Sequence, residues 1–218
     1  VVVNSPEGNT IAAAEHALAM MLSMARYIPE ANKSMKEGQW NRKLFVGTEV
    51  YKKTLGVVGL GKIGSHVATV AKAMGMKLLA YDPFISAERA EQLGCRLVDL
   101  AAIFRESDYI TLHIPKTPET TNLINAETLA KMKPHARIIN CARGGIIDES
   151  ALAAALKAGT IAGAAIDVFA TEPLGESELR SLGKEIVLTP HLGASTAEAQ
   201  VNVALDVAEQ IRDVLLGL

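Results

Sequence analysis

Three glycines, Gly59, Gly61 and Gly64, have the spacing G-x-G-x-x-G and directly follow an apolar run at residues 54–58. A strand that turns sharply into a helix presents backbone N–H groups and the positive end of the helix dipole, which suit a phosphate. In this pattern the first glycine permits the turn, the second lets backbone approach a pyrophosphate, and the third lets the helix sit close to the sheet. The pattern therefore predicts a site for an adenine dinucleotide.

One carboxylate, Asp82, ends the next apolar run at the distance expected for a residue that accepts hydrogen bonds from a ribose. A 2′-phosphate at that position would be repelled by the negative charge. The sequence therefore favours NAD over NADP as the cofactor. The alternative interpretation is a structural junction of strand, turn and helix that binds no nucleotide.

Two other side chains able to do chemistry follow later apolar runs. Arg143 lies between residues 137–140 and a Gly-Gly pair, at the carboxyl edge expected of a parallel sheet, where ligands bind. His191 follows residues 186–189. The alternatives are a surface arginine and a structural histidine. Cys141 is interpreted as a small packed residue rather than a nucleophile, because no base accompanies it by motif.

The other four histidines lack such surroundings, and their spacing predicts no metal site. We expect them to be core or surface residues, with only His113 near a cofactor: His16, His66, His113 and His135.

These side chains meet at one edge only if parallel strands position them. Short runs rich in Val, Ile and Leu, without polar alternation, predict strands covered on both faces: residues 54–58, 77–81, 109–113, 137–140, 161–168 and 186–189. Helices are expected between and after them: residues 62–74, 87–93, 97–104, 126–131, 148–158 and 196–216, with Asp148 as the cap of the fifth and Gly159 at its end. This alternation predicts an α/β fold, a Rossmann-type doubly wound parallel sheet.

The segment before the glycine turn has a different pattern. Residues 1–3 are expected to end a strand, and Thr10 to cap a helix that is apolar nearly all round and runs to about residue 27. Pro29 breaks or restarts that helix, and residues 38–47 form an ordered loop. The apolar helix predicts burial on several sides, part of which fits a subunit interface.

Composition excludes several classes of protein. The 218 residues are 49% hydrophobic and 21% charged with a net charge of −2, which indicates a globular chain and argues against a nucleic-acid partner. No apolar run is long enough to cross a bilayer. Cys95 and Cys141 are too few for a disulfide framework, so we expect reduced thiols and a cytoplasmic protein. A single domain is expected at this length.

Three ordered motifs, at residues 140–145, 167–173 and 190–195, resemble those of the D-2-hydroxyacid dehydrogenase family. The resemblance covers essentially the whole chain. Segments 4–9 and 40–49 resemble the members that oxidise a phosphorylated 2-hydroxy acid. The resemblance to the family implies that Arg143 binds the substrate carboxylate and that His191 is the general acid–base residue. It also implies that Glu172 orients His191 and favours its protonated form.

The resemblance also implies a set of NAD contacts around the glycine turn. The cofactor-binding residues it indicates are Gly59, Gly61, Lys62, Ile63, Gly64, Asp82, Ile114, Cys141, Ala142, Arg143, Asp167, His191, Leu192, Gly193 and Ala194. Asn4 and Arg42 are expected at the substrate, Arg42 by reaching its phosphate across a dimer interface; a solvated loop is the alternative for Arg42. The resemblance further implies a homodimer that forms through the nucleotide-binding domain.

Other functions remain open. A glyoxylate or hydroxypyruvate reductase is an alternative within the family, whereas formate dehydrogenase is disfavoured because it has glutamine where this chain has Glu172. An NAD-sensing co-repressor is an alternative outside enzymology. The family pattern further implies that most of the substrate domain lies outside this sequence, so we expect NAD binding with little or no turnover by the chain itself.

Overall fold

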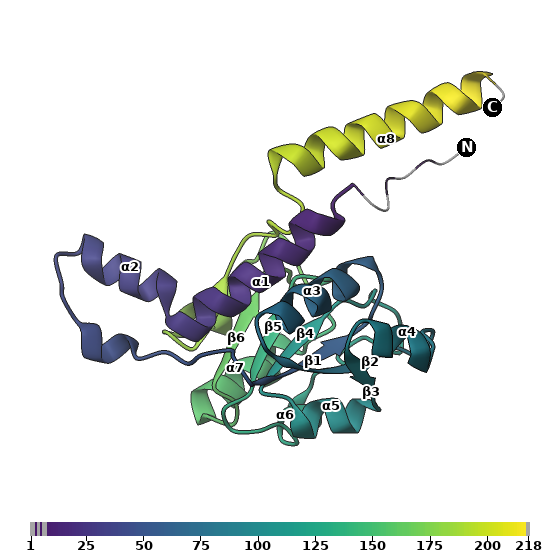
Figure 1. The fold of residues 1–218 in the computed structure, drawn as a ribbon. Coiled ribbons are helices and arrows are strands. Elements are labelled where there is room, and N and C mark those ends of the chain that lie inside the picture. The colour runs from purple at the N-terminus through teal and green to yellow at the C-terminus, as the bar shows by residue number, and fades with distance from the viewer. Residues whose placement is uncertain (1–2, 4, 6–7, 217–218) are drawn as a thin grey trace.

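Seven short strands form one parallel sheet in the computed structural model, which describes residues 3, 5 and 8–216 (Figure 1). Their bounds are β1 Thr54–Val58, β2 Lys77–Tyr81, β3 Cys95–Leu97, β4 Tyr109–Leu112, β5 Arg137–Asn140, β6 Gly163–Ile166 and β7 Ile186–Leu188. The sheet order is β3-β2-β1-β4-β5-β6-β7, and every pairing is parallel. The predicted doubly wound parallel sheet is confirmed.

The strand order reverses between β1 and β4, which are hydrogen-bonded neighbours. From β1 the chain moves outward to β2 and β3, and then returns to the other side of β1 with β4. In open α/β sheets a ligand binds in the crevice outside the carboxyl ends of the strands at such a reversal. Gly59 follows β1 and His113 follows β4, so both lie at that crevice.

Helices cover both faces of the sheet (Figure 1). On one face lie α1 (Thr10–Arg26) and α3 (Lys62–Ala73), which pack against each other and against the strands. On the other lie α5 (Leu100–Glu106), α6 (Ala126–Leu129) and α7 (Glu149–Ala158). The residues of β1, β4, β5 and β6 are almost entirely buried, as expected for strands covered on both sides.

Helix ends follow local chemistry. The Asp148 side chain accepts a hydrogen bond from the N–H of Ala151, and Gly159 ends α7 in the left-handed conformation at φ 69°, as predicted. The predicted cap at Thr10 is wrong: Asn9 is the N-cap residue, Thr10 is the first residue of α1, and no side chain caps that end. The helix expected at residues 97–104 begins later, because Asp99 caps α5 through the N–H of Ala102.

The strand β3 is absent from the sequence prediction. It has three residues at the edge of the sheet, which is too short for a recognisable apolar run. It is preceded by α4 (Ala87–Gln92), one residue shorter than expected. Strands β4, β6 and β7 are likewise shorter than their apolar runs, because only the paired residues count as strand.

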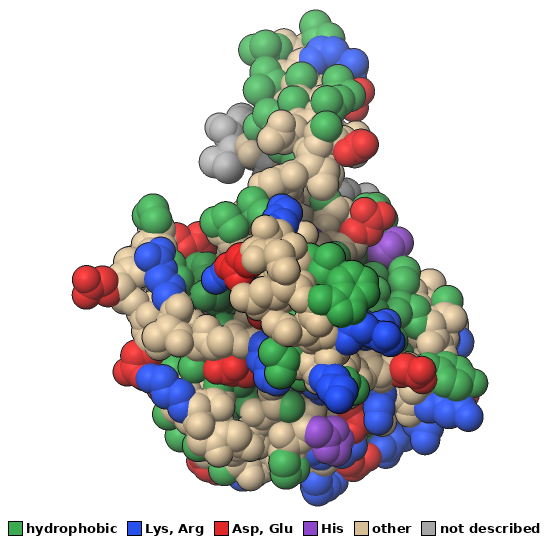
Figure 2. All heavy atoms as spheres, turned by 90° about the vertical axis from the view of Figure 1, so that its left-hand side faces the viewer, with side chains coloured by type: hydrophobic (Ala, Val, Ile, Leu, Met, Phe, Trp, Pro, Cys, Tyr) green, Lys and Arg blue, Asp and Glu red, His purple; other side chains and the backbone are tan. Residues whose placement is uncertain are grey.

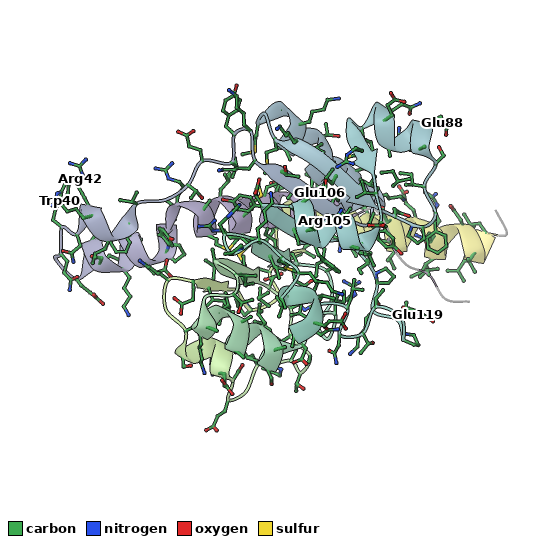
Figure 3. All side chains as sticks on the ribbon, turned by 90° about the horizontal axis from the view of Figure 1, so that it is seen from below. Trp40, Arg42, Glu88, Arg105, Glu106 and Glu119 are labelled. Carbon is green, nitrogen blue, oxygen red and sulfur yellow. The ribbon has the colours of Figure 1, made fainter. Side chains whose placement is uncertain are left out.

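Two parts of the chain extend beyond the sheet and its helices. Tyr27, at φ 52°, separates α1 from α2 (Ile28–Lys36), so the helix restarts at Ile28 with Pro29 in its first turn, close to the break or restart predicted at Pro29. The short helix η1 (Arg42–Phe45) follows, and Trp40 and Arg42 lie at the outer end of this extension (Figure 3).

The last helix, α8 (Ala197–Leu216), projects from the other end of α1 (Figure 1). Apolar side chains are exposed along it, and Figure 2 shows them at the top of the molecule. Among the helices that the structure describes, none is sufficiently long and apolar to cross a membrane. The strand expected at residues 1–3 is not seen at Val3, and Val1, Val2 and Asn4 lie outside the described residues.

Candidate active site

The glycine turn joins β1 to α3 at the strand reversal. Gly59 has a φ of 95°, a conformation that other residues rarely adopt, and a Cβ there would lie 2.5 Å from the carbonyl oxygen of His113. A Cβ on Gly64 would lie 1.9 Å from the carbonyl oxygen of Gly59, so only glycine allows this close packing of helix on turn. A Cβ on Gly61 would meet nothing within 4 Å, so that backbone faces open space.

Asp82, at the end of β2, holds the glycine turn. Its Oδ2 accepts a 2.8 Å hydrogen bond from the N–H of Leu60, and its Oδ1 accepts one of 2.9 Å from the N–H of Phe84. The carboxylate thus sits beside the turn with lone pairs left for another donor. The sequence placed Asp82 near this turn but gave no sign that it bonds to the turn's backbone.

Two cavities flank the turn at the carboxyl edge of the sheet. One, of about 640 Å³, is lined by Thr10, Ile11, Leu60, Gly61, Lys62, Ser65 and Arg89. The other, of about 360 Å³, is lined by Ser5, Asn9, Ala13, Ile63, His113, Ile114, Pro115, Cys141, Ala142, Arg143, His191, Gly193 and Ala194. Ten of the residues predicted to contact cofactor therefore line one or other cavity. The other five predicted residues line neither cavity: Gly59, Gly64, Asp82, Asp167 and Leu192.

A buried asparagine fixes the loop that carries Arg143. Asn140, at the end of β5, is 1% exposed. Its Oδ1 accepts a 3.1 Å hydrogen bond from the N–H of Ala142, and its Nδ2 donates one of 3.1 Å to the carbonyl of Arg143. The guanidinium of Arg143 also donates to the carbonyl of Ala142 at 2.6 Å. Gly144 then passes so close to Phe169 that a Cβ would overlap its carbonyl oxygen.

Glu172 and His191 form a hydrogen-bonded pair. His191 Nδ1 lies 2.7 Å from Glu172 Oε2, and Glu172 Oε1 accepts a 2.9 Å hydrogen bond from the N–H of Phe169. The hydrogen bond from His191, followed by that from Phe169, lowers the pKa of Glu172, so its carboxylate is ionised near neutral pH. The sequence motifs predicted this pair, and the structure brings its two members together.

Asp167 anchors the loop that carries His191. It lies at the end of β6, where its side chain is fully buried. Its Oδ1 accepts hydrogen bonds from the N–H of Leu192 at 2.7 Å and from the hydroxyl of Thr189 at 2.6 Å, while its Oδ2 accepts one of 2.9 Å from Gly193. Burial raises the pKa of Asp167, but hydrogen bonds from His16, the hydroxyl of Thr189 and the N–H of Leu192 outweigh it and lower the pKa overall.

His113 and Cys141 are both uncharged at the cavity. Burial lowers the pKa of His113 to about 4, and its Nε2 lies 2.9 Å from the hydroxyl of Thr111. Burial, followed by the negative charge of Asp167, raises the pKa of the Cys141 thiol well above its ordinary value. A protonated thiol is a poor nucleophile, which agrees with the interpretation of Cys141 as a packed residue.

His16 is a site residue that sequence reasoning missed. It was expected in the core or at the surface, yet its Nε2 reaches Asp167 Oδ1 at 3.2 Å. Potential ligand atoms of His16, Cys141 and Asp167 lie within 4.8 Å of one another. The Asp167 oxygens already accept four hydrogen bonds or ion-pair contacts, so the cluster is a hydrogen-bonded one. No sequence signal links His16 to residues 151 positions away.

Arg89 was also missed; it lines the larger cavity from α4. Arg42, predicted at the substrate, lies in the α2–η1 extension and lines neither cavity (Figure 3). Asn4, the other predicted substrate residue, lies outside the described residues.

The chain is similar to known proteins in both sequence and fold. The family model of the D-isomer specific 2-hydroxyacid dehydrogenase NAD binding domain matches residues 18–193. A D-3-phosphoglycerate dehydrogenase of Synechocystis sp. is 79% identical over 100% of this chain and 39% of its own length. The chain spans 39 to 41% of the length of three curated relatives that it matches.

Solved structures resemble the chain over nearly its full length. The D-lactate dehydrogenase of Aquifex aeolicus complexed with NAD and lactic acid has a TM-score of 0.88 and 29% identity, covering 98% of this chain and 68% of that one. A glyoxylate reductase of Paecilomyes thermophila has a TM-score of 0.90 and 32% identity, covering 96% and 63%. The chain belongs to the D-isomer specific 2-hydroxyacid dehydrogenase family, and it contains that family's NAD binding domain.

Proposed function

We propose that this chain is the cofactor-binding and catalytic part of an NAD-dependent D-3-phosphoglycerate dehydrogenase, which oxidises 3-phosphoglycerate to 3-phosphohydroxypyruvate. The observation that carries the proposal is the Glu172–His191 pair, with His191 and Arg143 lining the same cavity beside the glycine turn. The choice of substrate rests on 79% identity over the whole chain to a protein of that name. It also rests on segments 4–9 and 40–49, which resemble that enzyme.

The residues around the glycine turn fit NAD. The pyrophosphate would lie against Gly61, Lys62 and Ile63, where a Cβ at Gly61 would point into open space and α3 begins. Asp82 would accept hydrogen bonds from the adenosine ribose and repel a 2′-phosphate. The nicotinamide half would enter the cavity that Cys141, Ala142 and Ala194 line, among the remaining predicted contacts.

Arg143 and His191 would have different roles toward the substrate. The Arg143 guanidinium would bind the substrate carboxylate with two parallel hydrogen bonds and polarise the adjacent carbonyl. With Nδ1 of His191 donating to the Glu172 carboxylate, Nε2 has a lone pair that accepts the proton of the substrate hydroxyl. The ionised Glu172 favours the resulting imidazolium. When bound, NAD supplies the acceptor for the hydride from C2.

The proposal extends to the whole protein. Residues 1–218 would form one nucleotide-binding domain, and the remaining length of the relatives would contain the substrate domain. The exposed apolar side chains of α8, such as Val201 and Leu205, support packing of that helix against further polypeptide. The chain would act in the cytoplasm in serine biosynthesis.

We also propose a homodimer. The α2–η1 extension exposes Trp40 at 74%, Leu44 at 59% and Val46 at 76%, which supports an interface with a second copy. In such a dimer Arg42 would reach the substrate phosphate of the partner. Sedimentation of the wild-type protein and of the Trp40→Ala variant tests the proposed dimer. We expect the variant to lose the dimer.

A second candidate function is glyoxylate or hydroxypyruvate reduction, favoured by the TM-score of 0.90 with a glyoxylate reductase. The full-length gene product separates the two candidates through NADH-linked rates on 3-phosphoglycerate, glycerate and glyoxylate. We expect the highest kcat/KM with 3-phosphoglycerate. A higher value with glycerate or glyoxylate would replace the proposed substrate, and NAD binding without turnover of any of the three would favour a co-repressor. The 218-residue chain itself should bind NAD with little or no turnover.

A further inference from the structure

His16, on the buried face of α1, contacts two side chains at the carboxyl edge of the sheet. Its Nε2 lies 3.2 Å from Thr189 Oγ1 and 3.2 Å from Asp167 Oδ1. The ionised carboxylate of Asp167 can only accept hydrogen bonds, and the hydroxyl of Thr189 gives its proton to that carboxylate at 2.6 Å. The Nε2 of His16 must therefore be the donor, with its proton shared between the two oxygens.

Asp167 connects His16 to the loop that follows β7 through hydrogen bonds. The carboxylate accepts the N–H groups of Leu192 and Gly193, and the carbonyl of Asp167 accepts the N–H of His191 at 2.8 Å. Three successive N–H groups of the loop thus bond to one buried residue. The His16 side chain is 19% exposed and the Asp167 side chain 0%, so water competes little with these hydrogen bonds.

His191 needs such support because of its backbone conformation. Its φ is 55°, in the left-handed region, which costs free energy for a residue with a Cβ and persists only where the surroundings enforce it. This conformation directs the imidazole toward Glu172, with Nδ1 at 2.7 Å from Oε2. A small rotation of the loop would move the ring out of this geometry.

We propose that His16 is a positioning residue for His191. By donating to Asp167 and Thr189, it fixes the backbone of residues 189–193 and thereby the imidazole of His191 against Glu172. The catalytic consequence rests on the proposed dehydrogenase function, whereas the structural consequence does not. His16 itself lines neither cavity at the glycine turn, so it acts through the loop and not on the substrate.

The test compares three variants. His16→Leu removes the donor, and His16→Gln replaces it with an amide N–H at a similar reach. His135→Leu is the matched control, because His135 also bonds a carboxylate, Asp108 Oδ1 at 2.8 Å, but does so far from the site. Kinetics are measured on the full-length gene product well below the melting temperature and are normalised to folded protein.

We expect His16→Leu to lower kcat by about ten- to hundredfold while KM for NAD changes little, because misplaced reacting groups cost rates of that size. His16→Gln should restore most of kcat, and His135→Leu should leave kcat unchanged. A kcat equal to wild type in His16→Leu would overturn the proposal, and so would a failure of Gln to rescue combined with an equal loss in His135→Leu.

A second readout separates this inference from the proposed function. In ¹⁵N-edited spectra of the 218-residue chain, the His191 ring nitrogens report the hydrogen bond to Glu172. We expect His16→Leu to shift these resonances and to broaden the N–H signals of Leu192 and Gly193, with His16→Gln close to wild type. Unchanged His191 signals in His16→Leu would overturn the positioning role even if the enzyme acts on a different 2-hydroxy acid. Absence of turnover by the wild-type full-length gene product would overturn only the proposed function.

Discussion

His191 and Glu172 are joined through Nδ1 and Oε2 at 2.7 Å, although 19 residues separate them in the sequence. Glu172→Gln keeps the shape of the side chain and removes its charge, so the imidazolium formed during oxidation loses its counter-ion. We expect kcat of the full-length gene product to fall by about ten- to hundredfold, within the range for acid–base groups. Glu178→Gln is the control, because Glu178 is an exposed residue of helix η2 (Glu178–Ser181). Equal kcat in Glu172→Gln and wild type would remove Glu172 from the mechanism.

Two glycines of the same turn should respond to alanine in different ways. A Cβ at Gly64 would lie 1.9 Å from the carbonyl oxygen of Gly59, whereas a Cβ at Gly61 would meet nothing within 4 Å. Gly64→Ala should lower the free energy of unfolding by about 3 kcal/mol, as overpacking does. Gly61→Ala should fold normally and weaken NAD binding about tenfold, equivalent to about 1.4 kcal/mol. Urea unfolding and calorimetric titration distinguish these outcomes, and a stability loss confined to Gly61→Ala would contradict the account of the turn.

Asp82 should determine the preference between the two dinucleotides. Asp82→Asn removes the charge that repels a 2′-phosphate, but it also disturbs the hydrogen bonds from Leu60 and Phe84. Both cofactors need the same turn, so the ratio of their dissociation constants cancels that shared loss. We expect the ratio of Kd for NADP to Kd for NAD to fall about tenfold, since removing one like charge is worth about 1.4 kcal/mol at close range. An unchanged ratio would mean that Asp82 only supports the turn.

Asn140 should affect substrate binding and turnover more than cofactor binding, because its amide is hydrogen-bonded to the loop that carries Arg143. Asn140→Ala should raise KM for the hydroxy acid and lower kcat, with kcat/KM reduced about tenfold and Kd for NAD nearly constant. Asn125→Ala is the matched control, because Asn125 caps α6 and lines neither cavity at the glycine turn. Equal kinetic effects of the two substitutions would show that Asn140 contributes only to stability.

Asp108 should make the stability of the fold depend on acid pH. Burial raises the pKa of its carboxyl, but hydrogen bonds from Lys133, the N–H of Thr54 and His135 outweigh this and hold the pKa at about 2. A folded pKa below the unfolded value of 3.8 stabilises the fold above about pH 4, and this stabilisation is lost as pH falls from about 4 to about 2. The contribution is at most roughly 2 kcal/mol.

Asp108→Asn tests this sign. The variant should be less stable than wild type at pH 7, and the difference should shrink as pH falls through the window below pH 4. Urea unfolding at several pH values measures it. Parallel stability curves for the two proteins would contradict the assignment.

The strands of the sheet centre could be predicted because their residues are buried on both faces and therefore apolar without interruption. The ends of β1, β2 and β5 were predicted to the residue. The edge strand β3 was missed, since three residues with two exposed side chains leave no pattern. The cap of α1 was misassigned because Thr10 and Asn9 are both suitable residue types, and only the backbone angles distinguish them.

The candidate site could be predicted where its residues lie in contiguous motifs, as Arg143, Glu172 and His191 do. His16 could not be found, because a lone histidine on an apolar helix is usually a core residue and its partners come from β6 and β7. Arg42 lies in the α2–η1 extension (Figure 3), outside both cavities of its own chain, and its predicted contact with a substrate across a dimer interface stays a prediction. Tertiary contacts over long sequence separations decide such cases.

A crystal structure of this chain with NAD tests most directly the claim that cofactor and acid–base groups share one crevice at the β1–β4 reversal. We predict the pyrophosphate against Gly61 and Ile63, the adenosine ribose at Asp82, and the nicotinamide in the cavity that Arg143 and His191 line. NAD bound away from the glycine turn, or a nicotinamide that points away from His191, would contradict the account.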